Sequence, residues 1–179
     1  MKVTSGQVYT TLKGILSSPL TTAGFRRAKG VSLGWTKPEG DGSAFVSFQC
    51  DKYGWSDDWG STFTCEIELS RTSQPRAANF GGRFRLSHLL TGEELETLRE
   101  RNNRIIEALP GYLAGKTVAV TDGQGMECVI VGFRPAAEPY HSGWDTWMHY
   151  ASEAHVAEWG AYLETVLPIL FARAKARAS

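Results

Sequence analysis

The chain has 179 residues, of which 42% are hydrophobic and 21% charged, the composition of a globular protein with one sizeable core. Its 19 basic and 19 acidic residues cancel, so the sequence lacks the overall positive charge that non-specific binding of nucleic acid requires. No apolar run approaches the length of a membrane-spanning helix, so we expect no membrane partner.

The N-terminal residues and the cysteines bear on the cellular compartment. Residues 1–14 lack the apolar stretch of a secretory signal. Cys50, Cys65 and Cys128 are an odd and sparse set, which is typical of buried thiols in a reducing environment. We therefore expect a cytoplasmic protein.

The first part of the chain predicts one helix followed by three strands. Residues 6–17 place apolar side chains on one face of a helix, with Pro19 just beyond it. Alternation of apolar and polar residues predicts strands over residues 31–37, 44–51 and 62–70. Pairing of the last two strands is expected to bring Cys50 near Cys65.

The strand over residues 62–70 alternates strictly, which is typical of a sheet with one buried and one solvated face. On the outer face we expect Glu66 and Glu68 to be solvated. Residues 80–86 predict a further strand, and its Arg83 and Arg85 are expected to form a ladder of ion pairs with the two glutamates.

The second half predicts a helix, a hairpin and a long final helix. Thr91 and Glu94 have the spacing of a capping box that opens a helix ending near residue 109, and Asn102 falls in its inner stripe. Strands over residues 117–121 and 127–133 flank a glycine-rich turn, and 127–133 is apolar enough to be a central strand. The last helix covers residues 152–176, where Pro168 predicts a kink or a break.

Strands therefore come in runs instead of alternating with helices. This order predicts an α+β fold, an antiparallel sheet of about six strands with three main helices packed on it. We find no internal repeat and no low-complexity linker, so residues 1–179 are expected to form a single globular domain.

Three short motifs stand in the first two thirds of the chain: Leu20-x3-Gly24-Phe25-Arg26-Arg27, Phe45-x-Ser47-Phe48-Gln49 and Phe63-Thr64. Together with the order of elements they resemble a bacterial family of small α+β proteins, the domain of unknown function numbered 4304. The aromatic loop and tryptophan-containing helix at the end of the chain are similar to small immunity-type proteins that neutralise bacterial toxins. These resemblances imply the fold and a bacterial source, and they supply no catalytic residues.

The loop between the strands at 44–51 and 62–70 combines large aromatic side chains with carboxylates, the side-chain types that protein–protein contacts use. A second aromatic loop near residue 144 is expected to join it. The alternative, that the tryptophan rings fold back onto the sheet, stays open because tryptophan is usually mostly buried. The candidate partner-binding residues are Tyr53, Trp55, Asp57, Asp58, Trp59 and Trp144.

Catalytic motifs are absent from the sequence: it has no nucleophile elbow, no zinc-protease motif, no P-loop and no dinucleotide-binding glycine pattern. His141, Asp145 and His149 are the candidate metal ligands, because a helix would place them on one face at intervals of four residues. Pro139 and Gly143 favour a loop instead, which weakens that spacing argument. We expect no cofactor and assign no catalytic residue.

These observations favour a non-enzymatic protein-binding module. The specific form that we expect is a bacterial immunity or inhibitor protein, which binds and blocks a toxin through its acidic aromatic loop. Two alternatives remain open: a metal-dependent enzyme that uses the His/Asp/His cluster, and a protein that binds a small ligand between sheet and helices.

Overall fold

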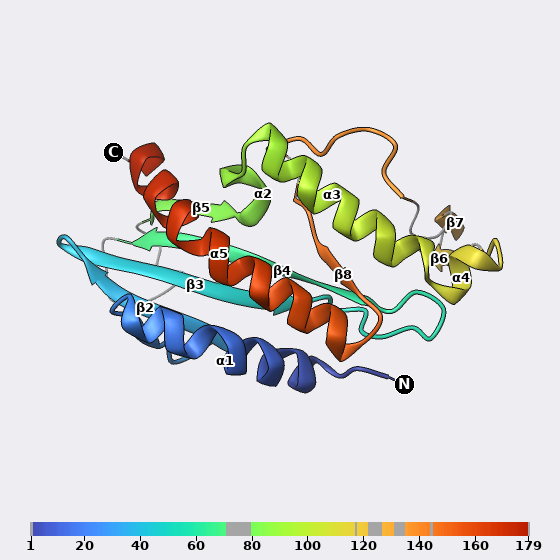
Figure 1. The fold of residues 1–179 in the computed structure, drawn as a ribbon, viewed down its shortest axis with the longest axis horizontal. Coiled ribbons are helices and arrows are strands. Elements are labelled where there is room, and N and C mark those ends of the chain that lie inside the picture. Colours follow the sequence, from blue (N-terminus) through green and yellow to red (C-terminus); the bar gives the residue numbers. More distant parts are fainter. Residues whose placement is uncertain are drawn as a thin grey trace.

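The structure, a computed structural model, has the predicted α+β fold, with an antiparallel sheet and helices packed against it (Figure 1). It describes residues 2–70, 80–116, 118–121, 127–130, 135–143 and 145–178. For residues 80–81, 118–121 and 127–130 only the backbone is described. None of the helices in these ranges combines the length and the apolar character that a membrane span requires.

Six strands form the main sheet in the order β1-β2-β3-β4-β5, and β8 lies on the same edge of β4 as β5. Every pair is antiparallel, as predicted. β8 pairs with the start of β4 and β5 pairs with its end, while β3 pairs along the opposite edge. β4 is therefore paired along both edges. The strands are β1 (Arg26–Arg27), β2 (Leu33–Glu39), β3 (Gly42–Cys50), β4 (Ser61–Ser70), β5 (Phe80–Arg85) and β8 (Met148–Tyr150).

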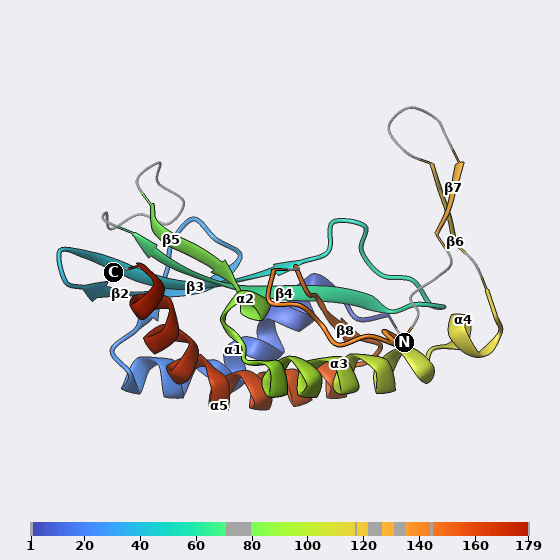
Figure 2. The same cartoon turned by 90° about the horizontal axis from the view of Figure 1, so that it is seen from above.

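Three long helices cover one face of this sheet (Figure 2). Apolar side chains from that sheet face and from these helices form the main core, in which Trp35, Phe63 and Trp159 are fully buried. No described helix lies on the opposite face, which we call the open face (Figure 2). The helices are α1 (Ser5–Thr22), α2 (Leu86–Leu89), α3 (Gly92–Glu107), α4 (Pro110–Leu113) and α5 (Glu153–Ala178).

The capping box at the start of α3 is confirmed, because the Thr91 hydroxyl accepts from the Glu94 N–H and the Glu94 carboxylate accepts from the Thr91 N–H. The prolines do not end their helices. α1 continues past Pro19, and α5 runs unbroken across Pro168, although its C-terminal end turns toward the sheet (Figure 2). Each proline removes one backbone hydrogen bond, but buried leucines on both sides of each proline keep the helices packed on the core.

The strands β6 (Val118–Thr121) and β7 (Glu127–Ile130) form the predicted hairpin. The prediction that this region supplies a central strand is wrong. Within the described part of the chain β6 and β7 pair only with each other, as a two-stranded ribbon beyond α4 (Figure 2). An apolar run alone does not distinguish a central strand from a short ribbon.

The expected solvation of Glu66 and Glu68 is also wrong, since the two residues are 4% and 6% exposed on the open face. The ion-pair ladder that accompanies this expectation is confirmed for Glu66. Its carboxylate oxygens lie 2.6 Å from Arg83 Nη2 and 3.1 Å from Arg85 Nε. A buried charge must be paired, and the arginines of β5 meet that requirement.

The register of β3 and β4 brings the two cysteines close to each other but not directly opposite, because they are offset by two residues along the pair. Cys50 lies opposite Phe63, and Cys65 lies opposite Phe48. Both thiols are free.

Candidate binding site on the open face

The loop from residue 51 to residue 60 rises above the open face between β3 and β4 (Figure 2). Tyr53 lies near the start of this loop, with 78% of its surface exposed. The Tyr53 backbone N–H donates to Asp51 Oδ1 at 3.1 Å, a local turn that fixes the start of the loop. An aromatic ring held on an ordered turn is suited to binding because little conformational entropy is lost on contact.

Trp59 has a different position from the one expected of a contact residue. It is 6% exposed and packs in a second apolar cluster with Ile106 and Leu109. Gly111 allows this packing, because a Cβ atom there would lie 2.6 Å from Trp59 Cε2. The ring of Trp59 therefore anchors the loop to the end of α3 and to α4, and it does not contribute to an exposed surface.

Local bonds hold the remaining predicted loop residues. Trp55 is half-buried, and its indole Nε1 donates to Asp57 Oδ1 at 2.9 Å. The Asp58 carboxylate lies 2.7 Å from Lys116 Nζ, and the Asp58 carbonyl accepts from the Gly111 N–H. Asp57 is exposed and thus remains available to a partner, whereas Asp58 mainly joins the loop to α4.

The 51–60 loop forms the first wall of the site, and residues 135–143 and 145–147 form its second wall. Contacts with α3 hold the second wall in place. Asn102, fully buried on α3, makes three hydrogen bonds to it and to β8. Its Nδ2 donates to Tyr140 Oη at 3.1 Å and to the Trp147 carbonyl at 2.8 Å, while its Oδ1 accepts from the His149 N–H at 2.9 Å. The sequence indicates Asn102 as part of the inner stripe; a polar residue in an apolar stripe is the signal for this role.

A second asparagine repeats this arrangement nearby. Asn103 donates from Nδ2 to the Ala136 carbonyl at 2.9 Å and accepts at Oδ1 from the Ala136 N–H at 2.8 Å. Arg99 Nη1 also donates to the Ala136 carbonyl, at 2.6 Å. Ala136, which precedes the aromatic residues, is therefore fixed to α3 by three hydrogen bonds.

The candidate metal ligands do not converge. His141 is exposed on the loop, His149 is buried in β8, and the Asp145 carboxylate lies 3.6 Å from Arg85 Nε and 3.3 Å from His88 Nε2. The helix that would align the three residues is not formed, because a loop leads directly into β8. No three His, Cys, Asp or Glu side chains in the described ranges are grouped to hold a metal ion.

Burial keeps three titratable groups beside the site, one histidine and two cysteines, in their neutral forms. Burial lowers the pKa of His149 to about 4, so the imidazole is neutral at physiological pH. Burial also raises the pKa of the Cys50 and Cys65 thiols, which keeps them protonated and poorly nucleophilic.

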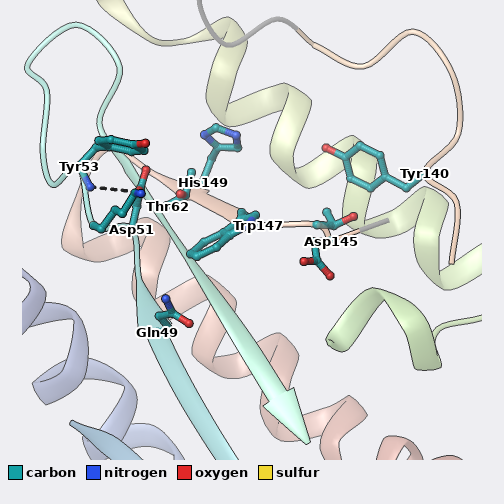
Figure 3. A pocket seen from close by; sticks show the side chains of 10 residues that line it. Gln49, Asp51, Tyr53, Thr62, Tyr140, Asp145, Trp147 and His149 are labelled. Atoms are coloured by element: carbon teal, nitrogen blue, oxygen red, sulfur yellow. Dashed lines mark hydrogen bonds between the residues drawn. The ribbon is translucent and has the colours of Figure 1, made fainter. Parts of the chain in front are cut away.

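A pocket of about 590 Å³ opens on this face between the two walls (Figure 3). Its volume falls in the range of about 300–1,000 Å³ that is usual for ligand sites. Of the predicted partner-binding residues, only Tyr53 lines it, and Trp144 lies outside the described residues. The lining residues are Gln49, Asp51, Lys52, Tyr53, Thr62, Tyr140, Asp145, Thr146, Trp147 and His149.

Several of these residues escaped prediction because they are far apart in the sequence. β3 supplies Gln49, β4 supplies Thr62, and β8 pairs beside them on the edge of β4. The pairing of β8 with β4 brings the second aromatic loop next to the first.

No protein-family model, curated protein or solved structure matches the chain. The resemblance to the family numbered 4304 and to immunity-type proteins therefore rests on the sequence positions alone.

We predict that Asn102→Ala lowers the free energy of unfolding by about 3 kcal/mol, because buried groups that lose a hydrogen-bond partner cost about 1–3 kcal/mol each. Urea unfolding measures the change. Glu100→Ala, at an exposed position of the same helix, is the control and should change stability by less than about 0.5 kcal/mol. Equal losses in the two variants would contradict the assigned role of Asn102.

The lowered pKa of His149 predicts that the free energy of unfolding depends on pH. The lowered pKa means that the unfolded chain binds a proton at a higher pH than the folded protein, so stability falls as pH falls from about 6.5 to about 4. The contribution of this one group is about 3 kcal/mol over that window, at about 1.4 kcal/mol for each pH unit. Unfolding free energies measured from pH 7 to pH 4 should show a shallower decline for His149→Gln, and identical slopes would refute the assignment.

Proposed function

We propose that the protein is a non-enzymatic protein-binding module. Its contact surface consists of the exposed part of the 51–60 loop, the pocket and the exposed part of residues 135–143 and 145–147; we call it the Tyr53 surface. The observation that carries the proposal is the exposure of Tyr53, 78%, beside a pocket on the face that no described helix covers.

The rigidity of this surface supports a binding role. Trp59 anchors the first wall, and Asn102 anchors the second. A surface that is ordered before contact loses less conformational entropy on association, which favours affinity. Large exposed aromatic side chains such as Tyr53 commonly supply most of the binding energy in such contacts.

The charge of the first wall indicates the kind of partner. The 51–60 loop carries three carboxylates, Asp51, Asp57 and Asp58, and one ammonium, Lys52. Asp58 is partly neutralised by Lys116, which leaves Asp51 and Asp57 to act on a partner. Charge complementarity then favours a partner with a cationic surface.

The specific form that we propose is an immunity or inhibitor protein in a bacterial cytoplasm that blocks a toxin. Its support is the similarity of the chain's end to immunity-type proteins, together with the acidic and aromatic character of the Tyr53 surface. A toxin whose active site is cationic would be inhibited simply by being covered.

A small-ligand-binding protein is the second candidate, and the volume of the pocket favours it. Thermal shift against a panel of metabolites separates the two functions, because a ligand that binds only the folded state raises the melting temperature.

We predict that Tyr53→Ala weakens partner binding by at least about tenfold, as truncation of an aromatic contact residue costs about 1–2 kcal/mol or more. The partner is first captured with the wild-type chain from cells that naturally produce it, then titrated by calorimetry. Ile169→Ala is the matched control, because Ile169 is also an exposed apolar residue, 46% accessible, but lies on α5.

Both variants should fold with wild-type stability, since both side chains are exposed. Unchanged affinity in Tyr53→Ala, or an equal loss in Ile169→Ala, would refute the assignment of the contact surface.

A further inference from the structure

The pocket on the Tyr53 surface combines two kinds of group that recognise cations. Tyr53, Tyr140 and Trp147 bring aromatic rings to it from separate positions in the chain. Asp51 and Asp145 bring carboxylates, and Figure 3 shows Trp147 between them. Aromatic faces attract cations through the ring quadrupole, and carboxylates do so through charge.

Two internal contacts show that these rings accept cations. The Lys52 ammonium lies 4.8 Å from the centroid of the Tyr53 ring. The guanidinium carbon of Arg85, which is not part of the pocket lining, lies 5.2 Å from the centroid of the Trp147 ring. Tyr53 is 78% exposed, so its ring also remains accessible to a further group, whereas Trp147 is half-buried.

The carboxylates keep acceptor capacity for a ligand. Asp145 is 54% exposed although it contacts Arg85 and His88. Asp51 uses Oδ1 to accept from the Tyr53 N–H. An ionised carboxylate offers about four lone-pair sites, so neither residue is saturated by these bonds.

The balance of charge along the lining is negative. Asp51 and Asp145 contribute two negative charges, and Lys52 contributes one positive charge. His149 adds none at neutral pH, because burial lowers its pKa to about 4. The lining residues therefore carry a net charge of −1 (one positive minus two negative groups), which Arg85 partly offsets by its contact with Asp145 from outside the lining.

We propose that this pocket receives an arginine side chain of the protein partner, whose guanidinium stacks on an aromatic ring of the lining and pairs with one of the two carboxylates, Asp51 or Asp145, while the other adds negative charge. A guanidinium suits the site better than an ammonium, because it is planar, stacks on aromatic rings and binds carboxylates with two parallel hydrogen bonds. That the arginine belongs to a protein partner rests on the proposed function. That the pocket binds a guanidinium rests on the pocket alone.

The test is a titration of the full chain, labelled with nitrogen-15, followed through the indole N–H signal of Trp147, which Trp147→Phe identifies. The probe is N-acetyl-arginine amide, and the control probe is N-acetyl-citrulline amide, a neutral isostere. We expect a saturable shift with a dissociation constant in the millimolar range, and binding of the citrulline derivative about fivefold weaker, equivalent to about 1 kcal/mol.

Variants of the carboxylates sharpen the test. Asp51→Asn and Asp145→Asn keep one carbonyl oxygen as an acceptor but lose the charge, so each should weaken the arginine probe by about threefold and leave the citrulline probe unchanged. Asp41→Asn is the matched control, because Asp41 is exposed in the turn between β2 and β3, outside the pocket lining. Absent or unselective binding, or an equal effect of Asp41→Asn, would overturn the proposal.

Free arginine separates the two sources of a guanidinium. Preference of the pocket for free arginine over the capped form by about tenfold, or about 1.4 kcal/mol, would assign the site to a small metabolite and overturn the protein source. The probes act without the partner, so their outcome is distinct from that of the partner titration. If the pocket binds the arginine and citrulline probes equally, the arginine proposal fails even where a partner has been captured. If the pocket selects the arginine probe, the arginine proposal stands even where Tyr53→Ala leaves partner affinity intact.

Discussion

The side-chain amide of Asn102 holds together the part of the molecule on which the binding site depends. Its three hydrogen bonds link α3 to β8 and to the loop before it, inside a region where an unpaired amide would be costly. β8 has only three residues, too few to hold a position by strand pairing alone. With the amide in place, β8 pairs with the start of β4 and its loop becomes the second wall of the pocket.

The two sides of the sheet have separate roles. The side beneath the helices is filled by leucines and aromatic rings, and it supplies stability. The open face is polar yet substantially buried, with Glu66 held by two arginines of β5. Buried ion pairs contribute little net stability. The same Arg85 contacts Trp147 and Asp145, so the ion-pair ladder extends directly into the pocket wall.

Alternation and capping signals were enough to predict the α+β class, the strands β2 to β5 and the start of α3, because these depend on neighbours in the sequence. Long-range packing decided the rest. β8 is too short to show a period, and Trp59 is buried against residues of other elements, Ile106, Leu109 and Gly111. Pro168 lies inside a helix that the core holds together. Tyr53, Asp57 and the approach of the second aromatic loop were predicted from the sequence, while the role of Asn102 became apparent only from the pairing of β8 with β4.

Hydrogen exchange of the backbone amides in the complex with the captured partner tests the central claim most directly, namely that the partner docks on the Tyr53 surface. Binding should slow exchange in the 51–60 loop and in residues 135–143 and 145–149, and leave α1 and α5 unchanged. Slower exchange confined to α1 and α5, with both walls of the pocket unaffected, would contradict the account.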